Sequence, residues 1–369
     1  MVVKKRSQAP DLLELHPLVR GFIRQSFSET ERMGFINRVI KVYQRFMGIN
    51  RKQLEYRPSL QFLQNWTQSA ELDVYARRFE DAFSALGEVC GTFIGSAYPR
   101  EFTRTARLLL DRIDWVAEYP RFAAFDLVFR TQVMLLDDLG QHAEADGLLE
   151  RYELTVPDKD ARYINYCDIR CYSKWVRGEF SMAVKWGNIG KNLMSSGVDT
   201  KYDVSHNLAL AERDAGRPEA ALSVFLSGRH LSEITNPKEL DERRGGHYYG
   251  NIGRCLHLMG QVDSALVCYQ KSALLLEKAR LEHTINQGFI RAWVAELLVA
   301  RQQITLAYVF YRAAYLKWRQ ASPPRAAQVK QVAQQFKDRI SESADTDDSS
   351  VEGMWIDWTL GENVDAKFS

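Results

Sequence analysis

The sequence predicts an all-α chain built from repeated helical hairpins. Four stretches share one signature: a glycine, an alanine five residues later, and a third residue four positions further on. The glycine permits a sharp turn out of one helix, and the alanine is small enough for the next helix to pack closely. The third residue shares a helix face with the alanine. Hairpins that cannot bury this face alone must stack on one another.

The repeated units follow one another through the middle of the chain. The four sets are Gly140, Ala145 and Leu149; Gly178, Ala183 and Gly187; Gly216, Ala221 and Phe225; and Gly260, Ala265 and Tyr269. A weaker fifth unit contains Ala307 and Tyr311, with Gln302 in place of the glycine. Upstream, the stretches around Ala82 and from Tyr98 to Trp115 are further degenerate units. We therefore expect helical repeats over residues 53–341.

This pattern resembles the tetratricopeptide (TPR) family. The fullest match is the fourth unit, in which these residues stand at the family's spacing: Tyr249, Asn251, Ile252, Gly253, Gly260, Ala265 and Tyr269. The resemblance implies a TPR-like α-solenoid, a right-handed superhelix of helical hairpins. It covers about three quarters of the chain and specifies fold better than function.

Composition is typical of a globular protein that works inside the cell. The chain has 369 residues, of which 46% are apolar and 26% charged, enough to bury a large core. No apolar run approaches the roughly 18 residues of a membrane span, and the polar, basic N-terminus has no signal-peptide core. We therefore expect a cytoplasmic protein.

The five cysteines are an odd number scattered over a long chain, which does not indicate a disulfide framework. Cys167 and Cys171 lie one helical turn apart, but neither has a CxxC partner or a nearby histidine set. We predict no metal site and no cofactor.

Catalytic motifs are absent from the sequence. GxSxG, HExxH and GxGxxG do not occur, and the seven histidines are dispersed. No GxxxxGK[ST] loop is present to hold a nucleotide phosphate. We therefore expect a protein that is not an enzyme.

Residues 1–52 form a basic segment that we expect to be helical. From Met1 to Gln53 there are eleven Lys and Arg against four Asp and Glu. Ser28 and Glu31 form a capping box that predicts a helix start. The positive charge could indicate a nucleic-acid arm, but apolar residues recur between the charges at helical spacing, which favours a solvated helical face.

The same segment holds a second resemblance. His16, Pro17, Leu18, Val19 and Arg20 precede the capped helix and the repeats. This order resembles the junction in STAND signalling NTPases, where the end of a winged-helix domain leads into a helix and then a TPR sensor. The resemblance implies a sensor separated from its NTPase, since the phosphate loop is missing.

The TPR resemblance implies a concave face lined by the first helix of each hairpin, mainly at positions 2, 5, 9 and 12 when the turn glycine is position 15. Aromatic, histidine and arginine side chains there would suit a polypeptide ligand. Asn207 and Asn251, at position 6 of adjacent units, match asparagines with which some TPR domains hold a peptide backbone or C-terminal carboxylate. The lysine and arginine positions of that carboxylate clamp are not reproduced. The predicted groove residues are Arg130, Asn165, Asp168, Tyr172, Trp175, His206, Asn207, Arg213, His247, Asn251, Arg254 and His257.

Residues 342–369 form an acidic tail. From Ser341 onward there are eight Asp and Glu against one Lys, and the Ser/Asp-rich first half has too few apolar residues to fold alone. Trp355 and Trp358 in the second half are costly to leave in water. We expect this motif to cap the last hairpin, with docking on another protein as the alternative.

These observations favour a non-enzymatic TPR protein-binding module that holds a protein or peptide in its groove. The second resemblance suggests the sensor or adaptor subunit of a bacterial STAND-like signalling or antiviral defence system, acting on a separate effector or NTPase chain. The alternative is a stand-alone TPR scaffold or peptide-responsive regulator. Nucleic-acid binding through the basic N-terminus is a weaker hypothesis, and no membrane partner is expected.

Overall fold

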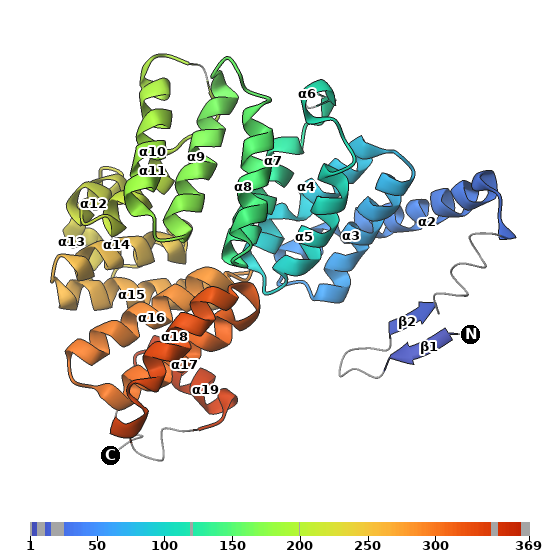
Figure 1. Cartoon of the computed structure of the whole chain (residues 1–369). Coiled ribbons are helices and arrows are strands. Elements are labelled where there is room, and N and C mark those ends of the chain that lie inside the picture. The colour runs from blue at the N-terminus through green and yellow to red at the C-terminus, as the bar shows by residue number, and fades with distance from the viewer. Residues whose placement is uncertain are drawn as a thin grey trace.

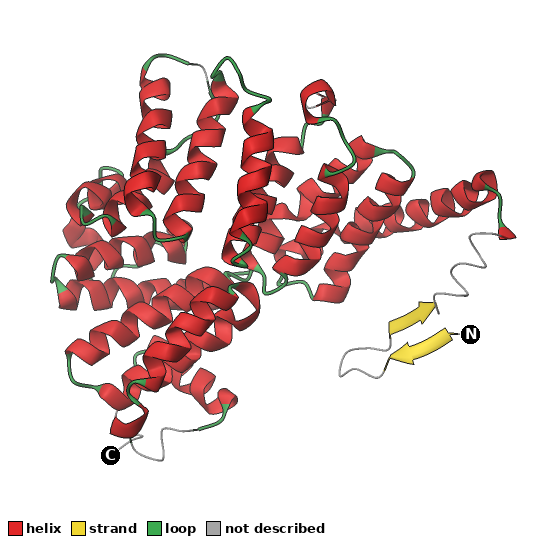
Figure 2. Cartoon of the chain, in the orientation of Figure 1, coloured by secondary structure: helices red, strands yellow, loops and turns green. Residues whose placement is uncertain are grey.

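The computed structural model describes residues 2–5, 12–15, 26–118, 121–198, 200–340 and 346–362, and most of them are helical (Figure 2). The exception is a two-stranded antiparallel hairpin of β1 (Val2–Lys5) and β2 (Leu12–Leu15). The segment expected to be helical therefore begins with strands, as the β-branched pair in β1 favours. The HPLVR motif at residues 16–20 lies outside the described residues.

The first long helix, α2 (Glu29–Asn50), begins at the predicted capping box. The Ser28 side chain accepts a hydrogen bond from the Glu31 amide, and the Glu31 carboxylate accepts one from the Ser28 amide at 2.8 Å. This pair satisfies two of the backbone donors that a helix start leaves unpaired. The sequence prediction of a helix start at Ser28 is confirmed.

In the described part of the chain, six helical hairpins follow, and Figure 1 shows them from α3 to α17. Their first helices are α3 (Leu60–Tyr75), α7 (Phe125–Asp138), α9 (Ala161–Val176), α11 (Ser205–Asp214), α14 (Gly246–Leu258) and α16 (Thr284–Ala300). Their second helices are α4 (Phe79–Gly95), α8 (His142–Glu153), α10 (Phe180–Ser195), α12 (Pro218–Leu226), α15 (Val262–Lys278) and α17 (Ile304–Ala321). Each first helix packs on its own second helix, and each hairpin packs on the next.

Shorter elements complete the described chain. They are η1 (Arg51–Glu55), α5 (Pro99–Leu110), α6 (Trp115–Glu118), α13 (Leu231–Thr235), η3 (Glu242–Arg244), α18 (Pro323–Gln334), η4 (Lys337–Arg339) and α19 (Asp348–Thr359). Helix α5 packs between α3, α4 and α7, and α18 packs on α17. The described part of the chain contains no helix with the length and apolar character to cross a membrane.

The turns inside the hairpins contain a residue in the left-handed backbone region. The four turn glycines have φ between +76° and +88°. Gln302 adopts φ +62° between α16 and α17, and Arg77 adopts φ +57° between α3 and α4. A side chain in this region costs about 1 kcal/mol relative to glycine. The turn geometry is therefore retained even where the sequence lacks the glycine.

The alanine five residues after each turn is buried. Ala145, Ala183 and Ala265 are 0% exposed and Ala221 is 1% exposed. One apolar cluster extends from Met47 in α2 to Ile169 in α9, and a second extends from Ala209 in α11 to Trp355 in α19. A third, smaller cluster of Cys171, Ala183 and Ala211 lies between them, so apolar contacts extend from each hairpin to the next.

Segments far apart in the sequence also touch. The Arg57 guanidinium donates to the carbonyl oxygens of Glu277 at 2.6 Å and Ala279 at 3.1 Å. Gly95, at the end of α4, lies against the carbonyl of Glu282, whose oxygen would be 2.0 Å from a Cβ atom at position 95. Only glycine fits there. The α3–α4 hairpin is therefore held against the turn between α15 and α16.

Replacing Gln302 with glycine tests the strained turn. Gln302→Gly should raise the free energy of unfolding by about 0.5 kcal/mol, because relief of the left-handed strain exceeds the entropy that glycine adds to the unfolded chain. Urea unfolding followed by circular dichroism measures the change. The matched control is Gln303→Gly, at φ −87°, which should not stabilise; equal stabilisation by both variants would contradict the strain.

Candidate functional site

A cavity of about 830 Å³ lies among the first helices α9, α11, α14 and α16 and the C-terminal helices α17 and α18. Its volume falls within the range of about 300–1,000 Å³ common for ligand sites. Ten of the 22 residues that line it are aromatic or arginine. They are Trp175, Phe180, Phe289, Trp293, Tyr311, Trp318, Arg177, Arg213, Arg254 and Arg325.

Phe289 and Trp293, one turn apart on α16, form the aromatic centre of the wall. Their rings stack with centroids 5.1 Å apart. Trp318 from the end of α17 meets Phe289 edge-on at 5.2 Å, and Trp175 from the end of α9 lies 6.1 Å from Phe289. The Arg325 guanidinium lies 5.0 Å from the centre of the Phe289 ring. Four helices therefore converge on one aromatic cluster.

Arg213 on α11 is a fixed, fully paired part of the wall. It donates two hydrogen bonds to the Asp214 carboxylate, at 2.8 and 2.7 Å, and a third to the side-chain oxygen of Asn251 at 2.9 Å. The Trp175 ring nitrogen donates to the same carboxylate at 2.7 Å. The Arg213 guanidinium also lies 5.2 Å from the centre of the Trp293 ring. Because its side chain is 1% exposed, these contacts link α9, α11, α14 and α16.

Arg254 on α14 pairs with Glu296 of α16 and lies 5.4 Å from the centre of the Trp293 ring. One nitrogen of Arg254 is 3.2 Å from Nδ1 of His257, which is also 3.3 Å from the Tyr269 hydroxyl. Burial and the positive charge of Arg254 lower the pKa of His257 to about 4. At neutral pH this ring is therefore uncharged and accepts a hydrogen bond.

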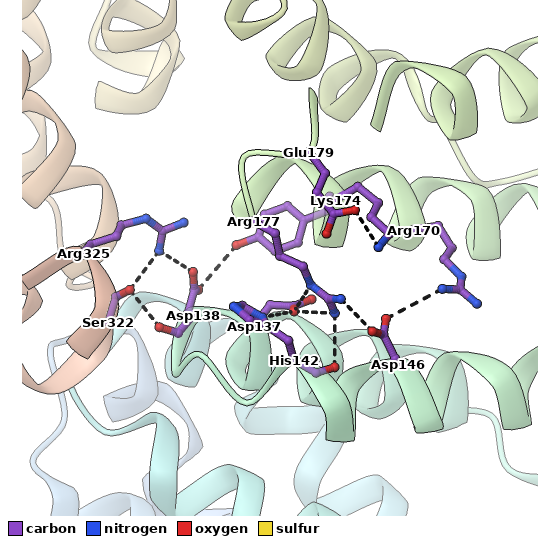
Figure 3. Close-up of polar contacts among 11 residues, drawn as sticks. Asp137, Asp138, His142, Asp146, Arg170, Lys174, Arg177, Glu179, Ser322 and Arg325 are labelled. Atoms are coloured by element: carbon purple, nitrogen blue, oxygen red, sulfur yellow. Dashed lines mark hydrogen bonds and ion pairs between the residues drawn. The ribbon is translucent and has the colours of Figure 1, made fainter. Parts of the chain in front are cut away.

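Asp138, the last residue of α7, connects the two halves of the chain (Figure 3). Its carboxylate accepts hydrogen bonds from Arg325 at 2.6 Å and from the Tyr172 hydroxyl at 3.4 Å, while its backbone carbonyl accepts one from the Ser322 hydroxyl at 2.7 Å. Burial raises the pKa of Asp138, and the charge of Arg325 opposes that shift. We call Asp138, Tyr172, Ser322 and Arg325 the Asp138 cluster. It positions α18 along one side of the cavity.

A second ionic group lies beside this cluster (Figure 3). Arg177, in the turn after α9, donates to Asp137 at 2.9 Å and to Asp146 at 2.7 Å. Arg170 is 3.7 Å from the same Asp146. The Arg177 side chain is 7% exposed and that of Asp137 is 0% exposed, so the group ties α7, α8 and α9 together at the cavity edge.

Three of the predicted groove residues line the cavity: Trp175, Arg213 and Arg254. Four others pair with one another between successive first helices, and a fifth, Asn251, accepts from Arg213. Arg130 pairs with Asp168 at 2.5 Å and donates to Asn165 at 3.4 Å, and Asp168 accepts from Asn207 at 2.8 Å. The two position-6 asparagines, Asn207 and Asn251, are 6% and 9% exposed and already bonded within the chain. These hydrogen bonds and ion pairs connect the successive first helices α7, α9, α11 and α14.

The other four predicted groove residues lie outside the cavity wall, in three different environments. Tyr172 belongs to the Asp138 cluster, and His257 contacts Arg254 and the Tyr269 hydroxyl. His206 and His247 are exposed, and the His206 ring meets Phe225 edge-on at 5.7 Å. The structure therefore does not join all twelve residues into one wall.

The sequence did contain a signal for the residues that were missed. With Gln302 taken as position 15, positions 2, 5, 6 and 9 of the fifth unit are Phe289, Ala292, Trp293 and Glu296, and all four line the cavity. Only the tertiary structure adds Arg325, because α18 follows no repeat signature.

In the tail, Trp355 and Trp358 lie on α19, which packs against α15 and α17. Trp355 is 1% exposed, its ring nitrogen donates to Glu277 at 3.1 Å, and both tryptophan rings pack edge-on against Phe310 at 5.1 and 5.7 Å. Asp347 caps the helix, so α19 includes part of the Ser/Asp-rich stretch. Both tryptophans therefore cover the last hairpin.

All five cysteines are buried and unpaired, and burial raises their pKa values to about 12. Thiols in that state are poor nucleophiles and poor metal ligands at neutral pH. Within the described ranges, no group of three or more His, Cys, Asp and Glu side chains is arranged to hold a metal ion.

No protein-family model matches this chain, and no curated protein matches it significantly. The function proposed below therefore depends on its residues and their geometry.

Removing Arg325 tests the Asp138 cluster. Arg325→Ala should lower the free energy of unfolding by about 3 kcal/mol, because it leaves the Asp138 carboxylate buried without its cation. Urea unfolding gives the energy, and faster amide hydrogen exchange in α18 reports its release. The control is Arg319→Ala on α17, whose half-exposed side chain pairs with Asp348 at 3.3 Å and should contribute less than about 1 kcal/mol. Equal losses in the two variants would show that the buried pair is unimportant.

Acid should destabilise the protein through His257. Its pKa is about 4 when folded and about 6.5 when unfolded, so between these values the unfolded chain binds more protons. Stability contributed by the neutral ring is therefore lost as the pH falls through this window. Lowering the pH from 7 to 5 should cost wild type about 1 to 2 kcal/mol more than His257→Gln, the full shift corresponding to the upper figure and solvent screening reducing it. Parallel urea titrations of wild type and His257→Gln at both pH values measure this difference. Equal changes in the free energy of unfolding between the two pH values would contradict it.

Proposed function

We propose that this chain is a TPR-like α-solenoid that binds a polypeptide segment in the central cavity. The observation that carries the proposal is the convergence of aromatic and arginine side chains from successive first helices on one cavity of about 830 Å³. Such side chains supply most of the binding energy in protein interfaces. The recurring left-handed turn five residues before a buried alanine supports the repeat architecture.

The charges in the cavity favour a polypeptide over a nucleotide. Arg213 is paired with Asp214, Arg254 with Glu296 and Arg325 with Asp138. Because these cations already have anionic partners, the wall offers little uncompensated charge for phosphate groups. Aromatic faces beside paired polar groups suit an apolar side chain and the flanking peptide backbone.

We propose further that peptide binding serves a sensor or adaptor role in a STAND-like signalling or antiviral defence system, with the effector or NTPase on another chain. The order of the HPLVR motif, the capped helix α2 and the repeats supports this assignment. A stand-alone scaffold or peptide-responsive regulator is the alternative. A neighbouring effector or NTPase gene would favour the sensor, whereas an unrelated gene neighbourhood would favour the scaffold.

Selection of displayed peptides tests the cavity. Peptides from a random library selected on the wild-type chain should bind Trp175→Ala and Arg254→Ala about thirtyfold more weakly, since truncating a true anchor costs about 2 kcal/mol. Isothermal titration calorimetry with the selected peptides measures the dissociation constants, after circular dichroism has established that each variant is folded.

Met182→Ala and Lys191→Ala serve as controls, because both residues are exposed on the second helix α10. They should leave peptide affinity unchanged. Peptides that lose affinity for these variants and keep it for the cavity variants would move the binding site to the outer helices and reject the proposal.

A further inference from the structure

Helix α2 exposes an apolar stripe next to the face that it packs on the body. Ile40 and Met47 are buried, and the Tyr43 hydroxyl donates to Gln68 of α3 at 2.5 Å. The adjacent face is open to solvent: among its residues, Val42 is 68% exposed and Ile49 is 74% exposed. Leaving these side chains in water is unfavourable, so the stripe is a candidate contact surface.

The residues of this stripe follow a heptad repeat. They are Phe35, Val39, Val42, Phe46 and Ile49, spaced by four, three, four and three residues. Apart from Phe46, which packs on Phe62 and Trp66, each of them is more than 40% exposed. This 4–3 spacing places side chains along one seam that faces a partner helix. The seam is about 21 Å long at 1.5 Å per residue. We call these five residues the α2 seam.

The charge beside the α2 seam has one sign. In heptad terms, with Val39 and Phe46 at position a, Arg38 and Arg45 occupy position g, and Lys41 is a further exposed cation. No Asp or Glu occurs between Glu31 and Glu55. The Arg38 guanidinium lies 5.9 Å from the centre of the Phe35 ring, at the seam itself. A partner helix on the seam would therefore meet positive charge along its flank.

From this geometry we propose that the α2 seam binds an amphipathic helix of another protein, with apolar residues at heptad spacing and glutamate or aspartate on its flank. Charges at positions e and g select the partner in coiled coils. A second copy of α2 gains no such pairing: antiparallel packing sets Arg38 and Arg45 against each other, and parallel packing sets them against Tyr43 and Asn50. The surface is separate from the cavity and goes beyond the peptide-binding function proposed above.

A synthetic acidic helix tests this surface on the full-length chain. The probe is a peptide of about four heptads with leucine at positions a and d and glutamate at e and g. Its lysine counterpart is the charge control. Fluorescence anisotropy should show micromolar binding of the acidic peptide, weaker binding at high salt, and no binding of the lysine peptide.

Val42→Asp should weaken binding of the acidic peptide at least tenfold without unfolding the chain, since Val42 is already exposed. Val224→Asp is the matched control, because Val224 is 44% exposed on α12, and it should bind as wild type does. Absence of acidic-peptide binding, or equal binding by Val42→Asp, would overturn the proposal.

Two further measurements test whether the α2 seam binds something other than an acidic helix. Sedimentation velocity that shows a dimer dissociated by Val42→Asp would assign the seam to a second copy of this chain. Flotation with vesicles of phosphatidylserine and phosphatidylcholine that is lost in Val42→Asp would assign it to an anionic membrane surface. Either result would overturn the proposal, and neither bears on the cavity, whose test uses different residues and ligands.

Discussion

The architecture depends on one local constraint: a residue in the left-handed backbone region, followed five positions later by a small buried residue. The first ends one helix abruptly, and the second lets the next helix lie close to it. Gln302 and Arg77 show how strongly this constraint acts, because both adopt positive φ despite their side chains. With the turn geometry retained from α3 to α17, each hairpin presents an apolar face that only its neighbours can cover.

Contacts between residues far apart in the sequence add to the packing of neighbouring hairpins. The Asp138 cluster joins the end of α7 to the start of α18, and Arg57 and Gly95 join the early helices to the turn after α15. These contacts position α17 and α18 opposite α9, α11 and α14. The cavity therefore depends on these long-range contacts, and its wall is made by residues from several hairpins and α18.

The position of a residue within the predicted repeat identified part of the cavity wall. It identified Trp175, Arg213 and Arg254, which line the cavity. It also selected Arg130, Asp168 and Asn207, whose side chains bond one another across successive first helices, where Asp168 and Asn207 are buried. The same positions thus line the cavity in some hairpins and bond neighbouring helices to one another in others.

The sequence by itself determined the all-helical class, the capped start of α2 and the turn sites, because these depend on local backbone preferences and on spacing along one helix. It also identified the apolar tail motif as a segment whose side chains must be buried. The tertiary structure alone decided that Trp175 and Arg325 meet Phe289, and that a strand pair precedes α2. Contacts between distant residues, such as Asp138 and Arg325, depend on how many successive helices pack, which local spacing does not specify.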